Sequence, residues 1–319
     1  MHNSDSKTIY RLWVQDERPA ALPIFFEPDW LDLFGNWNVC IVNGKNGNIE
    51  GVLPYSFEKK WGQTFINLPP LCPYLGPYLV YPDFEKNYSR YSFENRVLEA
   101  LIKQLPNTFF YKQKWVNPPQ NGQAFLWNKF RLHTAYTYII NDIKNLERVW
   151  SGFKKSVRNK IKQAETEYEV LEKNDPELFW RLHKQVYDLQ KMHVPYTQDV
   201  FNKVYHYGSK TNRGKLFFAF NQKKEAVAAL FLVNDQESVY LLGSGRTSNE
   251  EAKVSSLLVW NAIKHYSTVV DQFNFEGSII KRIATFNQSF GGELIPYLLV
   301  YKYQNRWVEA LHAIRRNAG

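Results

Sequence analysis

The alternation of apolar and polar positions repeats one order of elements twice along the chain. Each copy has three apolar stretches divided by turn residues, then a stretch with helical periodicity, then one more apolar stretch. Short apolar stretches between turn signals are typical of strands, and an Asn-Gly pair favours a hairpin because both residues accept a positive φ. Each copy is therefore predicted to form a three-stranded meander, a helix and a further strand. The expected strands cover 39–42, 49–55, 64–68 and 108–112 in the first copy and 216–220, 226–233, 238–242 and 272–275 in the second, with helices at 91–105 and 251–266.

Two copies of one unit predict a duplicated α/β protein, in which each unit has a central mixed sheet flanked by helices. We expect an N-terminal unit over 1–141, with its completion by the tail 304–319 left open, and a C-terminal unit over 142–303. The chain enters the second unit after an expected strand at 135–140. Asp142 follows that strand and is the expected N-cap of the next helix, because its carboxylate can accept a hydrogen bond from a first-turn amide.

The helix expected over 146–168 carries two faces of different chemistry. Aligned cations lower the cost of approaching phosphates, so the basic face is either a polyanion-binding stripe or the solvated side of a packed helix. Glutamates follow the basic face at once, which argues against a long nucleic-acid track. The apolar positions are Phe153, Val157, Ile161 and Ala164, and the basic positions are Lys154, Arg158 and Lys162.

Composition narrows the class of protein. The 319 residues are enough for two ordinary domains, and the formal net charge of +9 attracts anions such as nucleotides, tRNA or acyl-CoA phosphates. Cys40 and Cys72 are too few for a disulfide framework or a zinc pattern, and the histidines do not cluster at ligand spacings, so no metal is expected. The longest apolar run, 226–233, is too short to span a bilayer, and the first residues lack the pattern of a signal peptide. We therefore expect a cytoplasmic protein without a membrane span.

The order of elements within 134–303 resembles the GNAT acyltransferase fold. A tandem pair of such units is similar to the FemABX peptidyltransferases and to the related BioF2-like acetyltransferase-fold proteins. The resemblance implies an α/β fold of two tandem GNAT-like (acyl-CoA N-acyltransferase-like) units. It also implies transfer of an acyl or aminoacyl group onto an amine. The stretches that carry it are YTYIINDIKNLERVWSGFKKSVRNKIKQAETEYEV, LFFAFNQKKEAVAALFLVNDQESVYLLGSGRT, SSLLVWNAIKHYS and FNFEGSIIKRIATFNQSFGGELIPY.

The same resemblance implies the partners. The donor would be acyl-CoA or aminoacyl-tRNA, with no cofactor certain, and the acceptor would be a small-molecule or peptide amine. A tRNA or a nucleotide-linked anionic ligand is a further expected partner. The GNAT phosphate loop has glycines after an Arg or Gln, whereas here Gly243 and Gly245 precede Arg246, so we expect weak acetyl-CoA binding. The Phe-Lys pair of FemABX enzymes falls on Phe286 and Asn287, so its lysine is absent.

Glu276 is the candidate general base. In the fold that the chain resembles, the strand after the long helix borders the acceptor, and Glu276 stands at the end of that strand. A carboxylate there can accept a proton from the attacking ammonium, which must become a neutral amine before it can attack. Other interpretations stay open: Glu276 caps a helix beginning near Ser278 or bonds backbone N–H groups around Gly277, or it only binds a cationic substrate.

Other side chains complete the candidate site. Tyr240 could orient an acyl carbonyl or protonate a leaving group, or it is a core aromatic. Arg246 could hold a carboxylate or phosphate, or it is a solvated loop residue. Lys281 is a candidate replacement for the missing lysine. The expected pocket-wall residues are Tyr196, Asn287 and Tyr297, together with Tyr74 and Tyr78 from the proline-rich segment 69–82, which is either a cleft wall or a covering loop.

These features predict an acyl- or aminoacyltransferase that works by direct attack, because no cysteine or Ser-His arrangement suggests a covalent intermediate. Two alternatives remain. A non-catalytic GNAT-fold protein that binds an anionic partner would explain the missing lysine and the altered phosphate loop. A conventional acetyl-CoA N-acetyltransferase would reveal itself by tight binding of acetyl-CoA.

Overall fold

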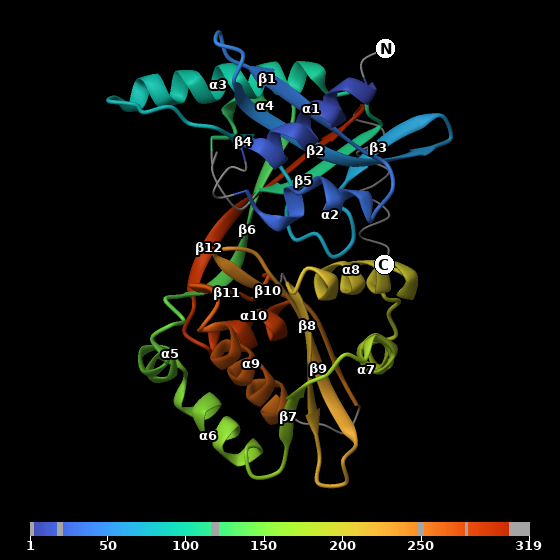
Figure 1. The fold of residues 1–319 in the computed structure, drawn as a ribbon, viewed down its shortest axis with the longest axis vertical. Coiled ribbons are helices and arrows are strands. Elements are labelled where there is room, and N and C mark those ends of the chain that lie inside the picture. Colours follow the sequence, from blue (N-terminus) through green and yellow to red (C-terminus); the bar gives the residue numbers. More distant parts are fainter. Residues whose placement is uncertain (1–2, 18–21, 116–120, 248–251, 278–279, 306–319) are drawn as a thin grey trace. The chain divides into compact units, whose positions relative to one another are not determined.

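The fold divides into two compact units. The first consists of residues 1–135 with 296–319, and the second of residues 136–295. The chain passes between them within β6 (Arg131–Asn141) and again within β12 (Glu293–Tyr303). The sequence placed the first division at the end of β6, whereas the contacts place it inside that strand. The computed structural model describes residues 3–17, 22–115, 121–247, 252–277 and 280–305, so most of the C-terminal tail lies outside the described residues (Figure 1).

The first unit is built on a mixed sheet with the strand order β1-β2-β3-β5-β12. β3 and β5 run parallel, the other neighbours in that order are antiparallel, and the short β4 pairs with β2. Helix α3 packs on β1 and β2 through an apolar face that includes Val97, Leu98 and Leu101. Besides β6 and β12, the elements of this unit are α1 (Asn3–Asp16), η1 (Ile24–Phe26), α2 (Pro28–Asp32), β1 (Trp37–Asn43), β2 (Ile49–Lys60), β3 (Gln63–Asn67), β4 (Tyr78–Leu79), α3 (Asn87–Gln104), β5 (Phe110–Trp115) and α4 (Gln123–Trp127).

The second unit has the strand order β6-β11-β10-β9-β8-β7. β10 and β11 run parallel, and the other neighbours are antiparallel. Helix α9 packs on β7, β8 and β9, whereas α7 packs on β9 and β10 and α8 on β8. The elements are α5 (Leu146–Gly152), α6 (Lys155–Ala164), β7 (Glu169–Glu172), α7 (Pro176–Leu189), α8 (Gln198–Lys210), β8 (Gly214–Phe220), β9 (Ala226–Asn234), β10 (Ser238–Arg246), α9 (Ala252–Tyr266), β11 (Gln272–Asn274) and α10 (Lys281–Gln288).

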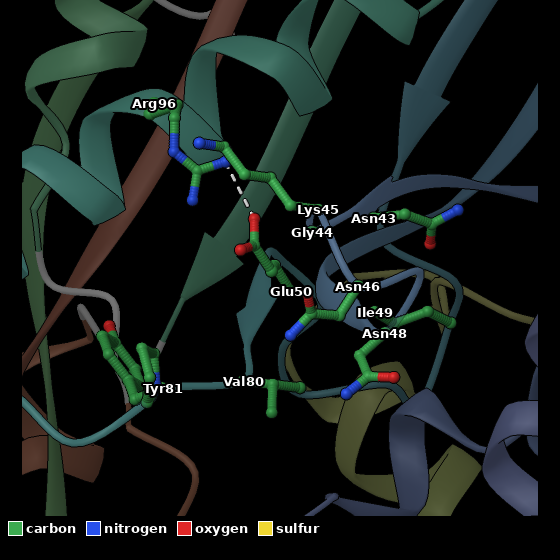
Figure 2. Close-up of a pocket in the computed structure, with 11 residues that line it drawn as sticks. Asn43, Gly44, Lys45, Asn46, Asn48, Ile49, Glu50, Val80, Tyr81 and Arg96 are labelled. Atoms are coloured by element: carbon green, nitrogen blue, oxygen red, sulfur yellow. Dashed lines mark ion pairs between the residues drawn. The ribbon is translucent and has the colours of Figure 1, made fainter.

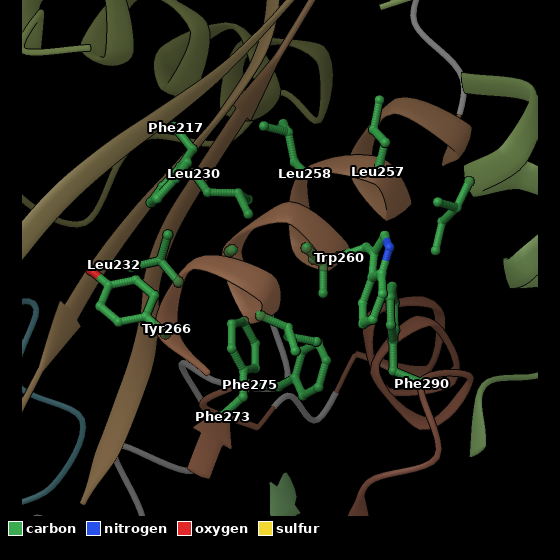
Figure 3. Close-up of a cluster of buried hydrophobic side chains, with 14 of the residues drawn as sticks. Phe217, Leu230, Leu232, Leu257, Leu258, Trp260, Tyr266, Phe273, Phe275 and Phe290 are labelled. Carbon is green, nitrogen blue, oxygen red and sulfur yellow. The ribbon is translucent and has the colours of Figure 1, made fainter. Parts of the chain in front are cut away.

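Alternate side chains of β9 point to opposite faces of the second sheet, as the strand repeat requires. Leu230 and Leu232 join the core beneath α9, which Figure 3 shows together with Trp260 of that helix. Phe231 instead contacts Phe179 of α7, at a ring distance of 6.0 Å. Full burial of each such side chain stabilises the fold by about 1.5–3 kcal/mol. Strand β9 is therefore buried on both faces.

The structure confirms the duplicated α/β organisation. Each unit has an antiparallel meander, then a long helix, then a strand parallel to the last strand of the meander. The expected helices are observed as α3 and α9, although residue 251, the expected start of the latter, lies outside the described residues. Strand β10 is longer than expected and reaches Arg246 instead of ending at residue 242.

The helix expected over 146–168 is broken into α5 and α6. Phe153 has an extended backbone, with φ of −67° and ψ of 141°, and its ring is buried against Trp260 at 5.4 Å. The Lys154 amide then donates to the carbonyl of Ser289. Arg158 donates to the carbonyl of Ser151 at 2.8 Å, so this member of the basic face also satisfies the end of α5.

The expected N-cap at Asp142 is wrong. Asp142 has a φ of 51°, and the helix begins at Leu146 with Asn145 as its cap. The Asn145 side chain accepts from the amide of Arg148 at 3.0 Å. Asp142 instead forms an ion pair with the Arg148 side chain at 3.2 Å.

Candidate functional site

Strands β10 and β11 begin side by side and then separate. Their pairing ends at Tyr240 and Asn274, although β10 continues to Arg246. Beyond this point β10 stays paired with β9, while the amide of Phe275 donates to the carbonyl of Tyr138 in β6. We call residues 241–246 of β10 and residues 275–277 after β11 the β10–β11 fork. Beyond Tyr240, the edge of β10 that faces the fork is no longer paired with β11, so its backbone groups are candidates for binding a ligand.

The backbone changes at the fork. Val239 and Tyr240 are buried, whereas Leu241, Leu242 and Gly243 are partly exposed. A β-bulge interrupts the pairing with β9 between Leu241 and Gly243. Bulges re-aim backbone groups and often lie beside active sites. Amides that point into the fork could donate to a carbonyl oxygen as negative charge develops on it.

Glu276 lies in the fork, directly after Phe275. Its side chain is partly buried, and its Oε1 atom is shielded from solvent. Its amide donates to Oδ1 of Asn274 at 2.9 Å. The same Oδ1 accepts from the Thr137 hydroxyl at 2.9 Å, and both Asn274 and Thr137 are buried. A buried polar pair thus holds the backbone of Glu276, since leaving such a group unsatisfied costs about 1–3 kcal/mol.

Glu276 and Gly277 both have left-handed backbone conformations, with φ of 59° and 47°. This conformation costs a residue with a side chain about 1–2 kcal/mol. A Cβ atom at Gly277 would lie 2.3 Å from the carbonyl oxygen of Tyr136, so glycine is required there. Such strained residues persist only where the surrounding structure holds them, and they cluster at active sites.

The helix that follows Glu276 begins later than expected. Helix α10 begins at Lys281, and its N-cap residue is Ile280. Ser278, where the helix was expected to begin, lies outside the described residues. Lys281 is exposed in the first turn of this helix, and Asn287 is buried near its end.

Tyr240 is buried, and its hydroxyl donates to Oδ2 of Asp235 at 2.8 Å. Asp235 lies in the turn before β10, so the phenol points back toward the start of the strand. Burial raises the pKa of Asp235, and hydrogen bonds from Ser238 and Tyr240 oppose that increase. This contact gives Tyr240 a role in anchoring the turn.

The glycines compared with a phosphate loop lie inside strand β10. A Cβ atom at Gly245 would lie 2.6 Å from the backbone nitrogen of His183, so this glycine allows α7 to approach the sheet closely. Gly243 lies beneath the same helix, near Phe179. Arg246 ends the strand and is partly exposed. Residues 248–251, which include the two glutamates of this segment, lie outside the described residues.

A histidine that the sequence did not single out lies over the fork strand. His183 of α7 is buried, with Nδ1 2.7 Å from the carbonyl oxygen of Ser244 and Nε2 2.8 Å from the hydroxyl of Tyr196. A carbonyl oxygen only accepts, so Nδ1 carries the hydrogen and Tyr196 donates to Nε2. Burial lowers the pKa of His183 and raises that of Tyr196. Because Ser244 is 61 residues away in sequence, no local pattern could have revealed this contact.

The candidate residues fall in both units. Glu276, Tyr240, Arg246, Lys281, Tyr196 and Asn287 belong to the second unit, whereas Tyr297, Tyr74 and Tyr78 belong to the first. Lys114 lies over the ring of Tyr297, with Nζ 4.2 Å from the ring centre. Tyr74 is buried against Phe25, at a ring distance of 5.2 Å, and the ring of Tyr78 lies near that of Trp13. Tyr74 thus packs inside the first unit.

Other kinds of site find little support in the described residues. Within them, no three His, Cys, Asp or Glu side chains gather as a metal site would require. Cys40 and Cys72 are buried free thiols, and burial raises the pKa of Cys40 to about 12. A thiol is a poor nucleophile under these conditions. In the part of the chain that the structure describes, no helix is both long enough and apolar enough to span a bilayer.

Comparison with known families gives one match. Residues 151–275 match the family model described as an acetyltransferase (GNAT) domain. The match covers the fork strands β10 and β11 and ends at the residue before Glu276. A search of curated protein sequences found no match.

Solved structures are similar over nearly the whole chain. The crystal structure of FemX has a TM-score of 0.63 at 12% identity, covering 93% of this chain and 96% of FemX. The C-terminal domain of a putative lysylphosphatidylglycerol synthetase from Agrobacterium fabrum has a TM-score of 0.57 at 10% identity, covering 96% of both chains. L-PGS from Bacillus licheniformis has a TM-score of 0.54 at 10% identity, covering 94% of this chain and 92% of that one. At such identities the likeness shows a common fold.

Proposed function

We propose that this chain, which matches a GNAT acetyltransferase domain model over residues 151–275 and shares its fold with FemX, transfers an acyl or aminoacyl group from an activated donor onto an amine. The observation that carries the proposal is the left-handed backbone of Glu276, which places a carboxylate in the β10–β11 fork. A left-handed backbone at a residue with a side chain lowers the stability of the fold, and such residues cluster at functional sites. Acid–base catalysis at the reacting amine is one function that such a residue can serve.

An ammonium acceptor must lose two protons in this reaction, one before its nitrogen attacks and one after the new bond has formed. An ammonium group must lose a proton before its nitrogen can attack the donor carbonyl. The Glu276 carboxylate takes that proton, and the new C–N bond forms as the carbonyl π electrons move onto oxygen. When the tetrahedral intermediate collapses, the bond to the donor's sulfur or oxygen breaks. The leaving atom takes the electron pair, and it is then neutralised by the second proton, which the nitrogen of the intermediate gives up.

The fork backbone supplies the second element of catalysis. The amides around the bulge at Leu241–Gly243 would donate to the oxygen that becomes negative in the intermediate. Removing one donor of this kind from an enzyme typically lowers turnover by about 10²–10³-fold. His183 and Tyr196 act differently, since they hold α7 against the same strand through the Ser244 carbonyl. We assign them a positioning role.

Two donor classes remain compatible with the fold. The match to an acetyltransferase domain favours an acyl-CoA thioester, whereas the resemblance to the FemABX peptidyltransferases favours an aminoacyl-tRNA. The net charge of +9 suits either polyanion. A cytoplasmic location and a peptide or small-molecule amine acceptor complete the proposal.

The test supplies both donors to the full-length protein. Radiolabelled acetyl-CoA and tRNAs charged with radiolabelled alanine, serine, glycine or lysine are each incubated with free amines and with UDP-linked peptides bearing a lysine amine. We expect amine-dependent transfer from one donor class, and we expect Glu276→Gln to abolish most of it. Glu237→Gln is the matched control, because Glu237 is exposed in the turn before β10.

The outcomes separate the alternatives. Transfer that persists undiminished in Glu276→Gln would refute the assignment of the base. Saturable binding of a donor without turnover against any acceptor would favour the non-catalytic alternative. Tight acetyl-CoA binding with acetyl transfer would establish the conventional acetyltransferase.

A further inference from the structure

The first unit contains a hollow that the proposed reaction does not use. It is formed by the turn between β1 and β2, by the segment after β4 and by α3, and its volume is about 620 Å³ (Figure 2). All its lining residues belong to the first unit, whereas Glu276 and the fork belong to the second. A volume in the range of about 300–1,000 Å³ is typical of small-molecule sites.

The charges in the hollow favour an anion. Lys45 and Arg96 both line it, and Glu50 is the carboxylate among its lining residues. Arg96 Nη1 lies 2.8 Å from Glu50 Oε2, an ion pair that also appears in Figure 2. A guanidinium has five N–H donors, so Arg96 keeps others for a ligand, and the Lys45 ammonium contributes three more. Two cations against one carboxylate leave one positive charge in excess.

The neutral groups in the hollow favour hydroxyls. Asn46 and Asn48 each present an amide that can donate and accept, as a sugar hydroxyl requires. Ile49 and Val80 add apolar surface beside them. A sugar ring offers the matching surface, because its C–H groups are apolar and its hydroxyls are polar.

The walls of the hollow are held in place before a ligand arrives. The Tyr81 hydroxyl donates to Oε1 of Glu94 at 3.0 Å, and Arg90 donates to the same oxygen at 3.1 Å. Glu94 is only 2% exposed, so this network fixes the tyrosine ring. In the turn, the amide of Gly44 donates to the carbonyl of Asn48 at 2.8 Å. A site that is already ordered loses less entropy on binding.

We propose that this hollow binds a small anionic sugar, that is, a polyhydroxylated ring that carries one phosphate or carboxylate. Lys45 and Arg96 bind the anionic group, and Asn46 and Asn48 bind hydroxyls. The site is independent of acyl transfer at the fork.

Isothermal titration calorimetry on the full chain tests this proposal with four probes: glucose 6-phosphate, glucuronate, glucose and inorganic phosphate. We expect at least one of the two anionic sugars to bind saturably, at least tenfold more tightly than either glucose or phosphate. The difference between glucose 6-phosphate and glucuronate identifies which anionic group the site prefers. Lys45→Ala should weaken binding about tenfold or more, because hydrogen bonds to charged groups are the stronger ones.

Two controls keep the test specific. Lys59→Ala removes an exposed lysine elsewhere on β2 and should leave the affinity unchanged, as should Glu276→Gln in the other unit. Lys45 and Asn46 are exposed turn residues, so their alanine variants should fold even if Arg96→Gln does not. The proposal is overturned if neither anionic sugar binds saturably, if phosphate alone binds as tightly as the sugars, or if Lys45→Ala and Asn46→Ala leave the affinity unchanged.

Discussion

The two units differ at the same point of their shared topology. In the second unit, β10 and β11 separate beyond Tyr240. Among the described residues, no other strand then takes the place of β11 beside β10. In the first unit, β3 and β5 pair at Ile66 and Tyr111, and the chain after β3 then returns to β5. There the amide of Leu75 donates to the carbonyl of Lys114 at 3.0 Å.

In the first unit, this returning segment packs beside β5 where β3 no longer pairs with it, and it closes the gap between the two strands. Leu75 is fully buried, and a Cβ atom at Gly76 would lie 2.2 Å from the ring of Trp115. The proline-rich stretch that contains them is therefore a covering loop at these positions. One copy of the unit fills this space with core packing, and in the other Leu241, Leu242 and Gly243 stay partly exposed. Residues 116–120, which follow β5 as Glu276 follows β11, lie outside the described residues.

The largest effect on activity should come from Glu276→Gln in the fork of the second unit. We expect turnover to fall by about 10²–10⁴-fold, the usual range for a positioned acid–base group. The free energy of unfolding should change little, since the shape of the side chain is kept and its backbone amide still donates to Asn274. Initial rates and urea unfolding curves on the same preparation check both parts. Lost stability with retained turnover would contradict the role of the fork.

A substitution in the closed gap of the first unit should lower stability and leave activity unchanged. Leu75→Ala removes a fully buried side chain and should lower the free energy of unfolding by about 2–5 kcal/mol. Activity per folded molecule should be kept. Leu126→Ala is the control, because Leu126 is 52% exposed and its loss should change stability by no more than about 0.5 kcal/mol. Equal effects from the two leucines in urea unfolding would show that the gap is not sealed by packing.

Gly277→Ala tests the conformation that carries Glu276. The new Cβ would collide with the Tyr136 carbonyl, and we expect a loss of about 3 kcal/mol from backbone strain and overpacking together. Gly47→Ala isolates the strain, because Gly47 also has a positive φ but no atom lies within 4 Å of its added Cβ. That control should lose about 1 kcal/mol. Thermal and urea unfolding compare the two, and equal losses would rule out the steric contact.

The smallest expected effect concerns pH. Burial lowers the pKa of His183 in the folded state, so the unfolded chain binds the proton more readily. Stability should therefore be full above the ordinary pKa of 6.5 and should decline as the pH falls below it. Burial lowers the pKa of His265 as well, so the change in slope in His183→Gln, measured by urea unfolding at several pH values, isolates His183. An unchanged slope would mean that His183 is protonated alike in both states.

The local elements could be predicted from the sequence. The turns Asn43–Gly47 and Asn221–Glu225 divide the first two strands of each meander, because asparagine and glycine accept turn geometry wherever the chain places them. Helix α9 follows from its apolar periodicity, and the repeat of the whole order indicated two units. These signals lie within a few residues of one another, so they need no knowledge of distant contacts.

Distant contacts decided what local signals could not. The break between α5 and α6 depends on Lys154 bonding to Ser289, and the length of β10 depends on its pairing with β9 and on α7 above its glycines. His183 meets Tyr196 only because the loop after α7 turns back toward the helix. Each of these residues is unremarkable in its own stretch of sequence, since its partner is supplied by the fold.

Glu276 depends both on local sequence signals and on distant contacts. The sequence alone put a carboxylate at the end of an apolar strand and before a glycine. The exclusion of a side chain at Gly277 depends on β6, and the Asn274 side chain that accepts from the Glu276 amide is itself bonded by Thr137 of that strand. Thr137, which holds Asn274, is 137 residues away in sequence. Only pairing of β6 with β11 could bring these groups together, because hydrogen bonds act over a few ångströms and the chain must fold to supply them.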